Sequence, residues 1–183
     1  MGPEITGHRS PGRRIMLTFG GVAVGTVLIW AAFLWMLPGV KVPAADAADT
    51  ASRLARILRL MPLPAGLLLL QVGTVAVARL ITGAFDPLRD TEGRAQRIGQ
   101  RVLSNTVEQT VIFVPALIGA AVLAGPGHLP MLVLAPGLFV AARLLFWAGY
   151  LIDPMYRAAG MAATLNINVG LVVFGAWRLV GAG

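Results

Sequence analysis

The chain has 183 residues, of which 57% are hydrophobic and only 13% are charged. This is too apolar for a single water-soluble core, so the composition predicts an integral membrane protein. There is no cysteine, which excludes disulfides and thiolate metal sites. The two histidines, His8 and His128, are far apart in the sequence, and we expect no metal site.

Fifteen Lys and Arg against eight Asp and Glu give a net charge of +7. Because the arginines lie in short polar stretches beside apolar runs, we assign them to membrane topology and expect no nucleic-acid partner.

The first apolar run, residues 15–37, follows a polar tail of residues 1–14 and contains no charge. It is long enough to span a bilayer with some tilt. A cleaved signal peptide is the alternative, but the run is longer than a usual signal core, so we interpret it as a retained transmembrane helix. Gly21 and Gly25 form a GxxxG pair in it and are a candidate close-packing face.

Residues 38–59 form the connection to the next apolar run. Arg53, Arg56 and Arg59 recur there at every third position, with aliphatic residues between them. This pattern predicts a short amphipathic helix at the membrane interface, which orients the span that follows. A lipid-specific binding site on the same helix is the alternative interpretation.

Four further apolar runs lie in residues 60–183, at 60–85, 107–125, 129–152 and 158–180. A polar stretch at 86–100, the sequence Gly125-Pro126-Gly127 and the pair Asp153-Pro154 separate them, and each is a helix stop or a turn. We therefore predict an all-α integral membrane protein, a four-helix transmembrane bundle with one extra N-terminal transmembrane helix. Asn166 and Asn168, inside the last run, are expected to form interhelical hydrogen bonds.

Positive charge predicts the orientation of these five spans. Eight arginines (residues 9, 13, 14, 89, 94, 97, 101 and 157) fall on one side of the membrane, whereas Lys41 and three arginines fall on the other. The side richer in arginine is expected to be cytoplasmic. We therefore expect a multi-pass protein of a bacterial inner membrane with its N-terminus in the cytoplasm and its C-terminus on the opposite side.

Polar residues gather where the third apolar run begins. Arg101, Asn105 and Glu108 are spaced so that they share one face of a helix, and Arg143 and Tyr150 share a face of the next helix. Charged residues at membrane depth usually face a protein interior or a wet cavity, so this pattern predicts a polar pocket in which Arg101 or Arg143 is the partner of Glu108. The alternative is an arginine–glutamate pair that only holds helices together.

From about residue 65 onward, the chain resembles the MAPEG family, the membrane-associated proteins in eicosanoid and glutathione metabolism. The family pattern R-x-x-x-N-x-x-E matches Arg101, Asn105 and Glu108. A second signature runs from Phe139-Val140 through Arg143 to Tyr150, and Ile81-Thr82-Gly83 resembles the end of the first family helix. The resemblance implies a MAPEG-type four-helix transmembrane domain that assembles as a homotrimer in the lipid bilayer.

The resemblance also implies a function, a glutathione-dependent transferase or peroxidase that acts on a lipophilic small-molecule substrate at the membrane. Glutathione would be the co-substrate. Tyr150 and Arg157 would be catalytic, with Arg157 stabilising the thiolate of glutathione. The residues implied to bind glutathione are Arg101, Asn105, Glu108, Arg143 and Arg89.

The chain departs from the family pattern at several basic or polar positions, which here are Leu103, Ser104 and Phe146. Some positive charges that would hold a tripeptide dianion are therefore missing. The alternative function is a catalytically silent lipid-binding or scaffold protein on the same fold.

Overall fold

The structure, a computed structural model, describes residues 10–83 and 93–181. Its long helices are α1 (Pro11–Met36), α4 (Pro62–Thr82), α5 (Arg94–Leu123), α6 (Leu129–Ile152) and α7 (Arg157–Gly181). The shorter elements are η1 (Leu37–Gly39), α2 (Ala44–Ala47), α3 (Thr50–Leu58) and η2 (Pro126–His128). The five long helices are long and apolar enough to cross a membrane, which confirms the predicted five-span helical architecture.

The helix ends follow from local backbone chemistry. Gly83 ends α4 in the left-handed conformation, with φ of 67°, which glycine adopts without a steric penalty. Asp153 ends α6 in an extended conformation because the following residue, Pro154, disfavours the helical one. Proline also stands in the first turn of α4, where its missing N–H costs no hydrogen bond.

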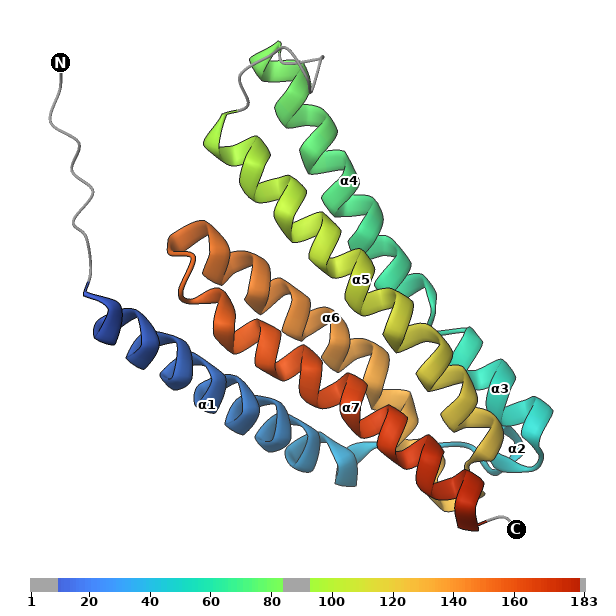
Figure 1. The fold of residues 1–183 in the computed structure, drawn as a ribbon. Helices are drawn as coiled ribbons and strands as arrows, with labels where there is room; N and C mark the ends of the chain where they lie inside the picture. Colours follow the sequence, from blue (N-terminus) through green and yellow to red (C-terminus); the bar gives the residue numbers. More distant parts are fainter. Residues whose placement is uncertain (1–9, 84–92, 182–183) are drawn as a thin grey trace, which may run out of the picture.

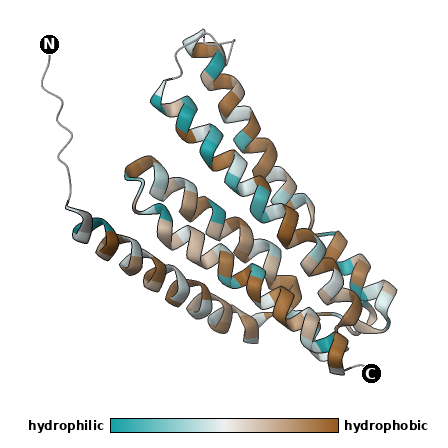
Figure 2. Ribbon diagram, in the orientation of Figure 1, coloured by the Kyte–Doolittle hydropathy of each residue, from teal (hydrophilic) through white to brown (hydrophobic). Residues whose placement is uncertain are grey.

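The long helices run side by side, with α4 beside α5, α6 beside α7, and α1 along the outer side of α7 (Figure 1). The start of α1 and the end of α7 lie at opposite ends of the bundle, as five crossings require (Figure 1). Hydrophilic residues concentrate on the first half of α5, whereas α1 and α4 are mostly apolar (Figure 2). Large apolar side chains such as Phe19, Leu69 and Ile81 are more than 70% exposed, as lipid-facing residues are.

One buried hydrophobic cluster lies between α3, α5 and α6 and includes Leu171 of α7. The rings of Phe113 and Phe139 are stacked there with their centroids 4.2 Å apart, and Ile57 of α3 is fully buried in the same cluster. Helix α3 is thus amphipathic, as predicted, but it packs against α5.

The arginines of α3 are held by the protein rather than presented together at the interface. Arg53 is only 9% exposed and donates to the Ala47 carbonyl at 3.2 Å and to the Thr50 hydroxyl at 2.9 Å. Arg56 lies 3.6 Å from the Asp46 carboxylate. Arg53 therefore faces the turn between α2 and α3, because that turn brings the Ala47 carbonyl within its reach, and the interfacial position of the helix stays a prediction.

Helix α1 meets α7 through its glycines. A β-carbon on Gly21 would lie 2.9 Å from the Ala158 β-carbon, and one on Gly25 would collide with the backbone of Ala159. The GxxxG pair therefore is a close-packing face, as predicted. Asn166 adds hydrogen bonds across the same pair of helices, since its amide donates to Thr26 at 3.1 Å and accepts from the Trp30 indole at 3.2 Å.

Candidate functional site

A polar pocket of about 400 Å³ lies at the arginine-rich end of the bundle. Helices α1, α5, α6 and α7 and the turn between α6 and α7 all contribute to its wall. Its polar side chains include Arg101, Asn105, Tyr150 and Arg157. The structure thus brings together four of the residues that the sequence singled out, although they come from three helices.

The α6–α7 turn sets the position of Arg157. The Asp153 carboxylate accepts from the backbone N–H of Met155 at 2.8 Å, and the Asp153 carbonyl accepts from the N–H of Tyr156 at 2.9 Å. Gly149 lets this turn approach α6, because a β-carbon there would lie only 2.7 Å from the Tyr156 carbonyl oxygen. The turn therefore returns the chain tightly onto α6 just before Arg157 begins α7.

Arg157 and Tyr150 form a pair in the pocket. The Arg157 guanidinium donates to the Tyr150 hydroxyl at 3.3 Å, and its central carbon lies 5.0 Å from the centre of the tyrosine ring. Arg157 is exposed, whereas Tyr150 is buried. The pair thus presents a fixed positive charge and a hydroxyl at one wall, which is suited to an anion.

Arg143 lies behind the pocket rather than in its wall. Its side chain is fully buried and is satisfied by neutral oxygens: it donates to the Asn105 side-chain oxygen at 2.9 Å and to the Thr106 hydroxyl at 3.1 and 3.3 Å. A longer contact of 3.5 Å reaches Thr164, and the guanidinium lies 4.1 Å from the centre of the Phe146 ring. Arg143 therefore holds Asn105 in position and is itself not presented to a ligand.

Glu108 does not have the arginine partner expected from the sequence. Within residues 10–83 and 93–181, no arginine lies within ion-pair distance of its carboxylate, which instead accepts from the Asn105 amide at 3.3 Å. The prediction that Arg101 or Arg143 pairs with it directly is wrong, because Arg101 lies about two helical turns away along α5 and the Asn105 side chain lies between Glu108 and Arg143. Asn105 stands between Glu108 and Arg143 and bonds to both. Arg89 lies outside the described residues.

Several residues around this pocket were not singled out from the sequence. Thr106 and Thr164 are fully buried and contribute the hydroxyls that face Arg143. Thr18 and Val22 show that α1 also forms part of the pocket wall. The only available signal for the threonines was their position as polar residues inside an apolar run. This signal is weak, because a threonine hydroxyl can donate its hydrogen bond to a carbonyl of its own helix.

Buried amides tie the bundle together deeper in the membrane. The Asn168 amide donates to the Gln109 side-chain oxygen at 2.9 Å and to its backbone carbonyl at 3.3 Å, which joins α7 to α5. With the bonds that Asn166 forms to α1, this confirms that both asparagines make interhelical hydrogen bonds.

Comparison with known proteins gives one family. Residues 58–177, about two thirds of the chain, match the model of the MAPEG family. A search among curated proteins finds no match. The matched region covers helices α4 to α7 almost completely and leaves α1 outside.

Proposed function

The chain belongs to the MAPEG family, and on that premise we propose that it is a glutathione-dependent transferase or peroxidase acting on lipophilic electrophiles from the bilayer. Glutathione is a common ligand of the family. The observation that carries the proposal is the pairing of Arg157 with Tyr150, 3.3 Å apart, in a pocket that also contains Arg101 and Asn105.

The chemistry requires a thiolate, because a thiol is a weak nucleophile until it ionises. Arg157 stabilises the negative sulfur, and the Tyr150 hydroxyl donates to it or to the peptide backbone of glutathione. In the transfer reaction, the sulfur bonds to an electrophilic carbon whose leaving group departs with the electron pair. In peroxide reduction, the sulfur attacks the O–O bond and the alcohol leaves after taking a proton. A second glutathione then reduces the sulfenic acid, giving the disulfide and water.

Binding of the tripeptide falls to the residues of α5. Arg101, exposed in the pocket, binds a carboxylate, since a guanidinium matches carboxylate geometry with two hydrogen bonds. Asn105 bonds to a backbone amide, and Glu108 takes the ammonium group. Arg143 acts through Asn105 as a positioning residue, in line with its complete burial and its bond of 2.9 Å to that side chain.

The exposed position of Glu108 supports self-association of the chain, for which the family resemblance implies a homotrimer. Glu108 follows the polar first half of α5 and is the second residue of the apolar run at 107–125, so its carboxylate lies at the edge of the hydrocarbon core. A carboxylate facing lipid at that depth is costly, so a second copy of the chain covers this face of α5 in the membrane. The subunit interface then lies beside the glutathione-binding residues.

The test is a titration of the purified protein with glutathione, monitored by the ultraviolet absorbance of the thiolate. We expect a thiolate signal near neutral pH in the unmutated protein. Arg157→Ala should raise the pKa of the bound thiol toward its free value, and each unit corresponds to about 1.4 kcal/mol. Arg101→Ala should instead weaken binding and leave the pKa of the remaining bound thiol nearly unchanged. Arg13→Ala is the matched control, because Arg13 is an exposed arginine at the start of α1 that does not line the pocket.

Two outcomes would contradict the proposed enzymatic function. Glutathione that binds without a thiolate signal would show that Arg157 does not activate it. Absence of glutathione binding would favour the lipid-binding or scaffold function, for which the internal use of Arg143 and the neutral residues Leu103, Ser104 and Phe146 already provide an argument.

A further inference from the structure

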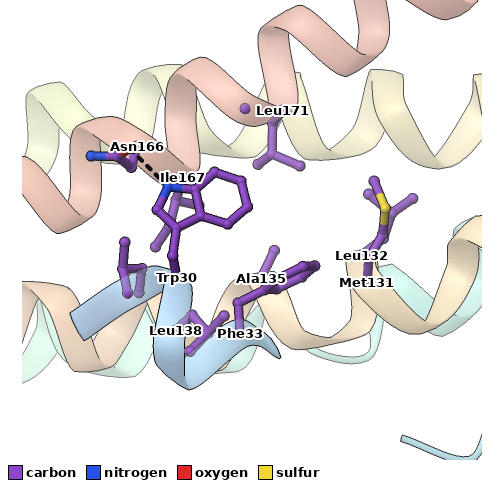
Figure 3. A pocket seen from close by; sticks show the side chains of 11 residues that line it. Trp30, Phe33, Met131, Leu132, Ala135, Leu138, Asn166, Ile167 and Leu171 are labelled. Carbon is purple, nitrogen blue, oxygen red and sulfur yellow. Dashed lines mark hydrogen bonds between the residues drawn. The ribbon is translucent and has the colours of Figure 1, made fainter. Parts of the chain in front are cut away.

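An apolar cavity of about 230 Å³ lies between α1, α6 and α7, farther along the bundle than the polar pocket. Figure 3 shows its walls. Trp30 and Phe33 come from α1, whereas Ala135 and Leu138 come from α6. The α7 wall consists of Asn166, Ile167, Gly170 and Leu171. Helix α1 lies outside the region matched by the family model, so one wall of the cavity is an addition to the family domain.

The cavity follows from the change in side-chain size along α1. Its middle touches α7 through Gly21 and Gly25, which bring the two backbones close together. Its second half carries Trp30 and Phe33, whose rings meet edge to face with centroids 5.9 Å apart. On the opposite wall, a β-carbon on Gly170 would have no neighbour within 4 Å. Large rings facing a glycine leave a space that no side chain fills.

The polar groups of the wall are already hydrogen-bonded. The Trp30 indole N–H donates to the Asn166 side-chain oxygen at 3.2 Å (Figure 3). The Asn166 amide donates to the Thr26 hydroxyl at 3.1 Å and to the Ala162 carbonyl at 2.9 Å. A water molecule in a buried site needs two or more polar partners, and an occupant here finds almost only carbon. The chemistry of the wall therefore selects an uncharged apolar group.

We propose that this cavity binds one hydrocarbon group about the size of an aromatic ring, drawn from the bilayer. An apolar cavity of about 150 Å³ is enough to hold benzene, so the volume suffices. The edges of Trp30 and Phe33 favour an aromatic guest, and a methylene segment of a lipid tail has the same apolar chemistry. This inference does not rest on glutathione binding, because the cavity shares no lining residue with the polar pocket.

Trp30 provides the probe for the test. In a variant whose other tryptophans are replaced (Trp35→Phe, Trp147→Phe and Trp177→Phe), Trp30 is the only indole, and a bromine in the cavity quenches its fluorescence. Bromobenzene added to the protein in detergent should quench with a saturable component. Ala135→Phe, which fills the cavity from α6, should abolish this component. Ala141→Phe, on an exposed position of the same helix, should leave it intact.

A pair of glycine variants keeps the test decisive if Ala135→Phe fails to fold. Gly170→Leu fills the cavity from α7, whereas Gly175→Leu is the matched control, because a β-carbon at either position has no neighbour within 4 Å and Gly175 does not line the cavity. Only Gly170→Leu should remove the saturable quenching.

A second arm identifies the source of the hydrocarbon. The single-tryptophan protein is placed in phosphatidylcholine vesicles whose acyl chains carry bromine. If quenching by the brominated lipid falls on Gly170→Leu but not on Gly175→Leu, the occupant is a lipid tail. If only bromobenzene shows this sensitivity, the occupant is a free apolar compound. Quenching that is linear in both arms and insensitive to Ala135→Phe and Gly170→Leu would overturn the proposal.

Discussion

The buried threonines around Arg143 offer a matched pair of substitutions. Thr106 and Thr164 are both fully buried, and each hydroxyl also donates to a carbonyl of its own helix at 2.8 Å. They differ in their contact with the guanidinium. Thr106 accepts from it at 3.1 and 3.3 Å, whereas Thr164 lies 3.5 Å away. Replacing each threonine by valine removes an equivalent intrahelical hydrogen bond. The two substitutions differ in the hydrogen bonds from the Arg143 guanidinium that are lost.

The magnitudes follow from these distances. A hydrogen bond to a charged group contributes about 1.5–3 kcal/mol, and Thr106 accepts two such bonds at one oxygen, so Thr106→Val should remove about 2–4 kcal/mol of this support. The single long contact of Thr164 should contribute less than about 1 kcal/mol. Since the loss of the intrahelical bond is common to both variants, Thr106→Val should be less stable than Thr164→Val by about 1–3 kcal/mol.

The assay is equilibrium unfolding in mixed micelles, monitored by helical circular dichroism. The same pair is then measured in the Arg143→Met background, where no guanidinium remains to be left unpaired. There the difference between the two threonine variants should shrink to about 0.5 kcal/mol or less. Equal losses in the Arg143 protein, or an undiminished difference in the Arg143→Met background, would refute the view that Thr106 supports this charge.

Two further predictions concern other parts of the fold. Gly25→Leu should separate α1 from α7 and destabilise the protein by about 1–3 kcal/mol in the same assay, whereas Gly20→Leu, at a position open on all sides, should have little effect; equal effects would contradict the packing argument. The backbone N–H of Ser52 donates to the carboxylate of Asp49, which caps α3, and holds the pKa of Asp49 below its ordinary value. A lowered carboxyl pKa stabilises the fold above the unfolded value of about 3.9, and the gain is lost as the pH falls through the folded value. Asp49→Asn should therefore lessen the loss of α3 helicity below about pH 4, and an unchanged acid profile would argue against this cap.

The five spans were predictable because each rests on a local property. Apolar runs of sufficient length set the helices, and breakers such as Gly83 and Pro154 set their ends. A close contact of Gly21 and Gly25 with another helix was also predictable, since two glycines at this spacing leave a flat surface on which a second helix can pack. The identity of the helix that packs there was not predictable, because nothing in the sequence of α1 alone specifies α7.

Four of the residues singled out from the sequence line one pocket, but the arrangement of the others around it was not predictable. The spacing of Arg101 and Asn105 places both on one helix face, and both line the pocket. That Arg143 would be buried against Thr106, and not presented to a ligand, depends on how far α6 is rotated against α5. The direct partner assigned to Glu108 was wrong for the same reason, since Asn105 lies between its carboxylate and Arg143 and bonds to both.

The two arginines beside Phe146 and Tyr150 show what this rotation achieves. Arg143 lies over Phe146, the rings of Phe146 and Tyr150 meet edge to face at 5.9 Å, and Arg157 lies over Tyr150. One charge is therefore fixed inside the bundle and the other faces the pocket, with an aromatic column between them. Under the proposed function, an anion in the pocket would meet Arg157 directly, so substitutions of the two arginines should differ in kind, with stability affected at Arg143 and ligand chemistry at Arg157.

Helix α1 belongs to both cavities although it lies outside the family match. Its first half contributes Thr18 and Val22 to the polar pocket, and its second half contributes Ile29 and Trp30 to the apolar cavity. Between them, Gly25 fixes the helix against α7. A helix that served only as a membrane anchor would need no such fit to α7, whereas a helix that completes two cavities needs a fixed position. The close glycine contact is therefore the structural condition for both proposed sites.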